Sequence, residues 1–253
     1  FHYIPPQVWA SRKWRIKGIK KYVDEVLCIF PFEIEMYQKE GINVHYCGHP
    51  LIKQLPEKAD REQFFAKHGL DTTRPLVSIF PGSRTIELRF LANTFIKSAK
   101  QLQKKHPEIQ FCISHAPNLS DDIFDKYING TDFKVIKGEN QALLSISDSL
   151  ILASGTVALE AALYQIPMII GYKGPWILYL AYLLVRCIKK VSLPNIITGE
   201  DIVPELIQAK FNTENICYET EKNLYNKEYR IGFIKALGMV KEKLSDKYSA
   251  EEV

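Results

Sequence analysis

Ser154, Gly155 and Thr156 form a small-residue turn within the stretch 149–165, between an apolar run and a helix-forming sequence. The free N–H groups of a helix's first turn and the positive end of its dipole suit a phosphate group. Glu160 follows Thr156 by four residues on the same helical face, where its carboxylate could accept hydrogen bonds from ribose hydroxyls. This pattern indicates a nucleotide site. The alternative is that Ser154 or Thr156 caps a core helix and Glu160 is a solvated surface charge.

A second turn of the same kind carries a cation. Gly82 and Ser83 follow an apolar run at 76–80, and Arg84 stands at the start of the next helix-forming stretch. A guanidinium can bind a diphosphate through two parallel hydrogen bonds. Arg84 could instead form only a surface ion pair with Glu87, three residues on, worth about 0.2 to 0.5 kcal/mol. Two such turns in one sheet favour a diphosphate site.

The elements that would position these turns alternate along the centre of the chain. We expect strands at 76–80, 109–114, 133–136, 149–153 and 167–171, and helices at 85–105, 120–128, 140–146 and 156–165. This alternation predicts an α/β fold, with a Rossmann-like parallel sheet, helices on both of its faces and ligands at the carboxyl ends of its strands. Both turns lie at such ends.

The flanking segments suggest further units. An apolar run at 23–30, a helix-forming stretch at 31–41 and a second apolar run after it predict one β-α-β unit. We therefore expect the end of one Rossmann-like domain at 1–55, a linker at 56–75, a ligand-binding Rossmann-like domain at 76–200 and carboxyl-terminal helices at 201–253 that pack back on the fold. Within the last segment, VPELIQ at 203–208 is expected to begin a helix near Pro204.

Composition limits the class of protein. Apolar residues make up 46% of the 253 residues and charged residues 25%, which is ordinary for a globular protein, and the net charge of +4 gives no argument for a nucleic-acid partner. The five cysteines are widely spaced and odd in number, which favours buried thiols in a reducing compartment over disulfides or a metal site. We expect a cytoplasmic protein with no metal.

Two segments have a composition suited to a membrane surface. Basic residues, Arg12 among them, alternate with aromatic and apolar residues from Trp9 to Lys21, as in segments that rest on anionic lipid. The alternative is a solvated basic helix whose apolar residues face the core. The apolar run Trp176–Val185 has ten residues, about half of the roughly 20 needed to span a bilayer. We expect peripheral attachment and no membrane-spanning segment.

Eight motifs in order make the chain resemble the lipid-A-disaccharide synthase family of GT-B-type glycosyltransferases, which have two Rossmann-like domains. They are YIPPQVWA at 3–10, PFE at 31–33, GHPL at 48–51, PGSR at 81–84 with Glu87, SGTVALE at 154–160, GYK at 171–173, LPNII at 193–197 and VPELIQ at 203–208. Members of this family are expected to have a whole domain before the first motif. On this resemblance the chain looks amino-terminally truncated, without the acceptor pocket and the general base, and is expected to be inactive alone.

The resemblance implies an inverting transfer of 2,3-diacylglucosamine from UDP-2,3-diacylglucosamine to 2,3-diacylglucosamine 1-phosphate. The products are a β-1,6-linked disaccharide and UDP, and no cofactor or metal is implied. It also implies a place on the inner face of the inner membrane, and it suggests a homodimer. The alternatives are a UDP-N-acetylglucosamine epimerase, a peptidoglycan-type glycosyltransferase and a non-catalytic UDP-binding fragment.

The resemblance also assigns roles to residues. It implies donor contacts for Gly82, Ser83, Arg84, Ser154, Gly155, Thr156, Glu160, Asn195 and Gln208, and candidate roles for His49, Tyr172 and Lys173. Arg84 would stabilise the leaving group and Glu160 would hold the ribose. Buried packing or helix capping is the alternative for Asn195 and Gln208, and turn formation is the alternative for His49. Ser11 and Glu200-Asp201 depart from the family's pattern, which bears on the acceptor and membrane contacts more than on the donor site.

Overall fold

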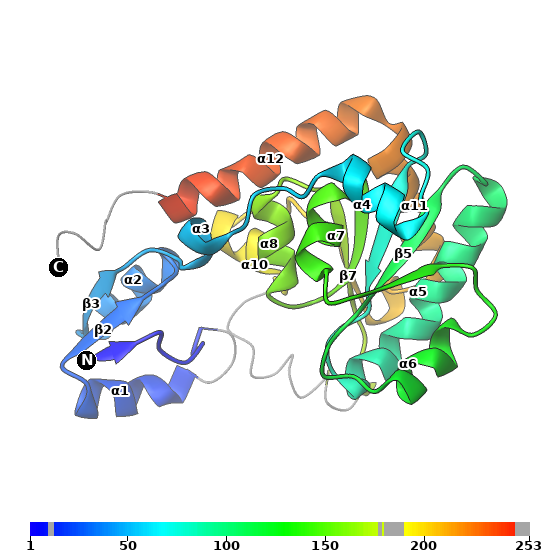
Figure 1. Cartoon of the computed structure of the whole chain (residues 1–253). Helices are drawn as coiled ribbons and strands as arrows, with labels where there is room; N and C mark the ends of the chain where they lie inside the picture. Colours follow the sequence, from blue (N-terminus) through cyan, green and yellow to red (C-terminus); the bar gives the residue numbers. More distant parts are fainter. Residues whose placement is uncertain (10–12, 177–178, 180–189, 246–253) are drawn as a thin grey trace.

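The described part of the chain contains two separate parallel sheets. A computed structural model describes residues 1–9, 13–176, 179 and 190–245. A three-stranded sheet has the order β1 (His2–Tyr3), β2 (Glu25–Cys28), β3 (Asn43–Tyr46), and a six-stranded sheet has the order β6-β5-β4-β7-β8-β9 (Figure 1). The strands of the larger sheet are β4 (Leu76–Phe80), β5 (Gln110–His115), β6 (Lys134–Lys137), β7 (Ser149–Ala153), β8 (Met168–Tyr172) and β9 (Glu205–Ile207). The expected α/β class, with a parallel sheet between helices, is confirmed.

Helices cover both faces of the larger sheet. In β7, Leu150 and Leu152 belong to one buried cluster and Ile151 and Ala153 to the other, because successive side chains of a strand point to opposite faces. The first cluster packs against α4 (Arg61–His68), α7 (Asn140–Ile146), α8 (Val157–Leu163), α10 (Leu193–Thr198) and α12 (Lys227–Ser245). The second packs against α5 (Thr85–Lys105), α6 (Asp121–Ile128) and α11 (Thr213–Tyr225). All five residues of β7 are buried, as expected for a strand covered on both faces.

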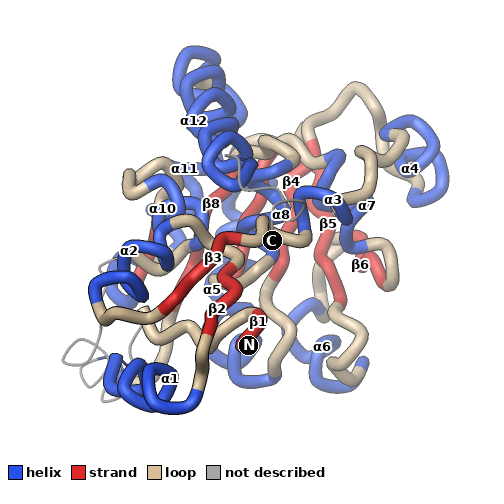
Figure 2. Tube along the Cα trace, turned by 90° about the vertical axis from the view of Figure 1, so that its left-hand side faces the viewer, coloured by secondary structure: helices blue, strands red, loops and turns tan. Residues whose placement is uncertain are grey.

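The smaller sheet carries its own helices. They are a 3-10 turn η1 (Lys13–Arg15), α1 (Ile16–Tyr22) and α2 (Phe32–Lys39), and the short helix α3 (Leu51–Gln54) that follows β3 packs against the larger core. The long helix α12 runs from the larger sheet toward this part of the chain (Figures 1 and 2), and the Tyr46 hydroxyl donates to the Leu244 carbonyl at 2.6 Å. The segment expected to be a linker contains α4, whose Phe65 is fully buried in the larger core. The domain limits themselves remain a proposal.

One expectation about secondary structure is wrong. VPELIQ does not begin a helix: Glu205–Ile207 form β9, an edge strand of the larger sheet, with Leu206 opposite Gly171. Glu, Leu and Gln favour helices, and a proline is common at a helix start. Pairing with β8 overrides this local preference, since strand formation depends mainly on neighbouring strands.

The basic segment near the amino terminus is also different from the first expectation. Trp9 is buried, and its Nε1 donates to Glu33 Oε1 at 2.9 Å, so Trp9 cannot contact lipid. Ile16 and Ile19 face the small core, whereas Trp14 is 64% exposed. The apolar residues Ile16 and Ile19 thus face the core, as the alternative expects, while the basic side of the helix is open to solvent and its contact with a membrane stays a prediction. Arg12, Ser11 and most of the run Trp176–Val185 lie outside the described residues, and none of the described helices is both long and apolar enough to cross a bilayer.

The carboxyl of Glu33 should make stability depend on pH. Burial raises its pKa to about 7, against smaller opposing effects of hydrogen bonds from the Phe30 amide and Trp9. The neutral carboxyl is favoured in the folded state, so its stabilisation is complete at low pH and is lost as the pH rises through about 7. We expect this group alone to cost about 3 kcal/mol of unfolding free energy by neutral pH. In urea titrations, Glu33→Gln should remove that pH dependence. Glu35→Gln, on the same helix but exposed, should keep it.

Candidate functional site

The two turns meet in one cleft at the carboxyl ends of neighbouring strands. Strands β4 and β7 pair directly, with Phe80 opposite Leu152, so the segments that follow them lie side by side. A cavity of about 550 Å³ opens between them. From the predicted set, Gly82, Ser83, Arg84, Ser154, Gly155, Thr156 and Glu160 line it. The structure therefore brings together seven predicted residues from two distant parts of the sequence.

Arg84 precedes the first turn of α5 and has a side chain that is 75% exposed. Its Nη1 lies 3.4 Å from Glu87 Oε1, so the ion pair considered from the sequence does form. This contact is long and exposed, and such pairs contribute little to stability. A phosphate oxygen can therefore replace Glu87 as the partner of the guanidinium with little loss of stability. The phosphate would also lie near the positive end of the dipole of the 21-residue helix α5.

Glu87 orders the turn that carries Arg84. Its Oε2 accepts from the Ser83 amide at 2.8 Å and from the Arg84 amide at 3.2 Å, so these two N–H groups already have a partner. Gly82 has φ of 109°, and a Cβ there would lie 2.3 Å from Glu87 Oε2. Only glycine fits at this position. The turn thus presents the Ser83 hydroxyl and the Arg84 guanidinium, rather than these two amides, to a ligand.

The second turn leaves its helix start open. Within the described chain, the Thr156 side chain forms no capping hydrogen bond, although Thr156 is the residue that precedes α8. Thr156 therefore does not cap α8 through its side chain. In the first turn of α8, the Ala158 amide donates instead to the backbone carbonyl of Gly155 at 3.3 Å. Gly155, with its backbone amide, and Thr156, with its amide and its hydroxyl, line the cleft wall.

Glu160 is half-buried in the cleft wall and is not the freely solvated charge of the alternative interpretation. Burial raises the pKa of its carboxyl, while a hydrogen bond with Gln141 acts in the opposite direction. A carboxylate with reduced access to water gains from new hydrogen-bond donors, such as the two hydroxyls of a ribose.

Sequence reasoning missed four polar residues of the cleft. Ser114 lies near the end of β5, Asn118 follows that strand, and Asn140 and Gln141 begin α7 after β6. Ser114 Oγ donates to Asn140 Oδ1 at 2.8 Å, and Asn118 Nδ2 donates to the Ser83 carbonyl at 2.6 Å. The signal that could have found them is their position at the carboxyl ends of predicted strands.

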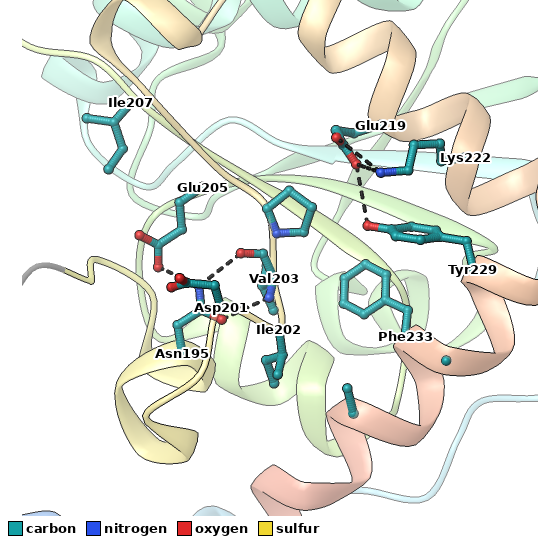
Figure 3. Close-up of a pocket in the computed structure, with 13 residues that line it drawn as sticks. Asn195, Asp201, Ile202, Val203, Glu205, Ile207, Glu219, Lys222, Tyr229 and Phe233 are labelled. Carbon is teal, nitrogen blue, oxygen red and sulfur yellow. Dashed lines mark hydrogen bonds and ion pairs between the residues drawn. The ribbon is translucent and has the colours of Figure 1, made fainter.

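Asn195 lies away from this cleft. It belongs to a second cavity, of about 660 Å³, between the edge strand β9 and helices α11 and α12 (Figure 3). Its Nδ2 donates to the Val203 carbonyl and to Glu205 Oε1, both at 2.9 Å, and its Oδ1 accepts from the Val203 amide at 2.8 Å. Asn195 is 1% exposed. This agrees with the alternative of buried packing, because both the N–H groups and the oxygen of the Asn195 amide form hydrogen bonds within the protein.

Gln208 is also engaged within the chain. Its Oε1 accepts from the Gly174 amide and its Nε2 donates to the Gly174 carbonyl, each at 3.1 Å. The backbone of Gln208 has φ of 51°, a left-handed conformation that is uncommon for residues other than glycine. Gln208 therefore fixes the loop after β8, and its contact with the donor stays a prediction.

The three remaining candidates divide between two places. His49 Nδ1 accepts from the Leu51 amide at 3.2 Å, its ring lies 5.1 Å from that of Phe30, and burial lowers its pKa. It forms a turn outside the cleft. Tyr172 and Lys173 line a smaller cavity that adjoins the cleft. Among the described residues, no three His, Cys, Asp or Glu side chains are grouped as metal ligands would be.

Comparisons with known proteins agree with the motifs. The family model described as lipid-A-disaccharide synthetase matches residues 1–248. The lipid-A-disaccharide synthase of Geobacter sulfurreducens is 36% identical over 255 residues, which cover 100% of this chain and 66% of that protein. That of Trichlorobacter lovleyi is 37% identical over 246 residues, covering 96% and 64%. The chain thus spans about two thirds of the length of these curated relatives.

Solved structures show the same fold at low sequence identity. The UDP-GlcNAc 2-epimerase of Neisseria meningitidis bound to UDP-GlcNAc has a TM-score of 0.60 at 15% identity, covering 88% of this chain and 62% of the other. An MnaA–UDP co-structure from S. aureus has a TM-score of 0.63 at 11% identity, covering 89% and 60%. These similarities establish the fold alone. From the family match along nearly its whole length, the chain belongs to the lipid-A-disaccharide synthetase family.

Proposed function

We propose that this chain binds the UDP-linked donor in the synthesis of the lipid A disaccharide. In that reaction 2,3-diacylglucosamine passes from UDP to 2,3-diacylglucosamine 1-phosphate, and UDP leaves. The observation that carries the proposal is the common cleft of the two turns, in which a guanidinium from one and a carboxylate from the other face the same space. A diphosphate and a ribose need these two kinds of group within one site.

The proposed chemistry is a single displacement at the sugar's anomeric carbon by the acceptor hydroxyl. As the bond to UDP breaks, negative charge grows on the β-phosphate. Arg84 and the positive end of α5 stabilise that charge, which is an effect of preorganised groups and typically worth about 10²-fold or more in rate. Glu160 holds the ribose, and the open start of α8 supplies further N–H donors at Gly155 and Thr156.

Sequence identity favours this function over epimerisation. Two lipid-A-disaccharide synthases are 36% and 37% identical to the chain over nearly all of it, whereas the epimerase structure shares 15% identity. In calorimetry, the chain is expected to bind UDP and to bind UDP-2,3-diacylglucosamine more tightly than UDP-N-acetylglucosamine. Absence of UDP binding, or conversion of UDP-N-acetylglucosamine to its 2-epimer, would contradict the proposal.

We also propose that the chain rests on an anionic membrane surface on the cytoplasmic side, where an acylated donor is found. The support is the solvent face of α1, on which Lys17, Lys20, Lys21 and Tyr22 are exposed beside Trp14. This face combines cations with aromatic rings, the two features that favour an anionic interface. The homodimer stays a prediction.

Removing three of these cations should weaken membrane binding strongly. Each lysine near an anionic surface contributes about 1 kcal/mol, so Lys17→Ala, Lys20→Ala and Lys21→Ala together should lower the partition coefficient about 100-fold. The measurement is sedimentation with phosphatidylglycerol vesicles at low salt. The matched control replaces Lys97, Lys100 and Lys104, which are exposed on α5. If both triple variants lose vesicle binding equally, net charge and not the face of α1 determines binding.

A further inference from the structure

A smaller cavity, of about 260 Å³, adjoins the proposed donor cleft. Both are lined by Arg84, Glu87, Ala153 and Ser154, so the smaller cavity begins where the proposed diphosphate site ends. A group attached to a diphosphate held by Arg84 can therefore enter it without crossing any element of the fold.

The walls of this cavity are mainly apolar. Ile86 and Phe90 come from α5, four residues apart and therefore on one helical face. Tyr172 ends β8, and Pro175 lies in the segment that follows it. Ile86 is 52% exposed and Tyr172 41% exposed, which makes them large apolar side chains open to solvent at a site edge. A concave apolar surface beside a polar cleft is typical of a site for an amphipathic ligand.

The wall formed by the segment after β8 is held in place. The Gln208 side chain forms hydrogen bonds with both the amide and the carbonyl of Gly174, at 3.1 Å each. The backbone of Gln208 has a left-handed conformation at this position. Backbone strain of this kind persists only where other contacts maintain it. The cavity is therefore a preformed feature, since its second wall is fixed by a buried side chain from β9's end.

Building on the proposed function, we propose that this cavity binds a hydrocarbon chain carried by the donor sugar. The diphosphate would lie against Arg84 in the larger cleft, and the chain would extend along Ile86 and Phe90 toward Tyr172. UDP alone would not reach these residues, and an acetyl group is too short to fill the space. The site would thus distinguish long-chain acylated donors from ordinary UDP-sugars.

The test compares three ligands in calorimetry: UDP, UDP-N-acetylglucosamine and UDP-2,3-diacylglucosamine below its micelle concentration. Ile86→Ser should leave UDP affinity unchanged and lower affinity for the diacylated donor about tenfold, the size expected when an isoleucine loses its apolar burial. Ile86 is half-exposed, so the substitution should not affect folding. Phe90→Ser should act in the same direction. Ile231→Ser, at a 60% exposed isoleucine on α12, is the matched control.

The outcomes separate this inference from the proposed function. If the unmodified chain binds no UDP, the proposed function fails. If UDP binds normally but Ile86→Ser and Phe90→Ser bind the diacylated donor as tightly as the Ile231→Ser control, the hydrocarbon site is wrong while the donor cleft stands. Loss of vesicle binding by Ile86→Ser, with unchanged donor affinity, would assign Ile86 to a membrane contact and likewise overturn the inference.

Discussion

Arg84→Ala is expected to weaken UDP binding by about 10- to 100-fold. A hydrogen bond to a charged group contributes about 1.5 to 3 kcal/mol, and each 1.4 kcal/mol is tenfold in affinity. The guanidinium is 75% exposed and forms only a 3.4 Å contact with Glu87, so removing it should cost the fold little. The loss should therefore appear in the dissociation constant measured by calorimetry and leave the unfolding midpoint nearly unchanged.

Two further variants show whether the geometry or only the charge of Arg84 matters. Arg84→Lys keeps the charge but cannot form two parallel hydrogen bonds, so it should recover only part of the affinity. Arg89→Ala removes the same charge from an exposed position on α5 that does not line the cleft. We expect Arg89→Ala to bind UDP like the unmodified chain. A common decrease in both alanine variants would mean that Arg84 acts only through long-range charge.

Glu160→Ala should weaken UDP binding about tenfold or more, because two ribose hydroxyls would lose a charged acceptor. The effect should be specific to the sugar: 2′-deoxy-UDP should lose less on this substitution than UDP. Glu214→Ala, at an exposed position on α11, removes the same charge outside the cleft and serves as the control. If UDP and its 2′-deoxy form lose equal affinity, Glu160 does not contact the 2′-hydroxyl.

The same carboxyl predicts how UDP affinity varies with pH. Burial raises the pKa of Glu160 above the usual glutamate range, so it becomes protonated at a higher pH than an exposed glutamate would. The neutral carboxyl is the weaker acceptor, and UDP affinity should therefore fall as the pH is lowered through that pKa. Glu160→Gln should bind more weakly at neutral pH and show a flatter profile on the acid side, as measured by calorimetry at a series of pH values.

The sequence was enough to predict the larger sheet and the cleft because both follow from local patterns. The strands at 76–80 and 149–153 and the helices at 85–105 and 140–146 agree with the structure residue for residue. These strands are fully buried, so their apolar runs stand out from the helices around them. Once their parallel pairing is assumed, the turns of Arg84 and Ser154 must lie at the same edge of the sheet.

What could not be predicted depends on contacts between distant residues. Pairing of Glu205–Ile207 with β8 decides that this segment is a strand, and its own residues favour a helix. Trp9 is buried because it meets Glu33, which lies 24 residues away. Asn195 and Gln208 were assigned to the donor by resemblance, but their partners are Glu205 and Gly174. Both polar residues thus support the framework of the fold, and their contact with the donor stays a prediction.

The most direct measurement is a crystal structure of the chain with UDP bound. The account predicts that the β-phosphate lies within hydrogen-bonding distance, about 2.7 to 3.2 Å, of the Arg84 guanidinium, and that the ribose hydroxyls lie at the same distance from the Glu160 carboxylate. UDP found in the other cavity, between β9 and α12, or bound with its diphosphate away from both turns, would contradict it.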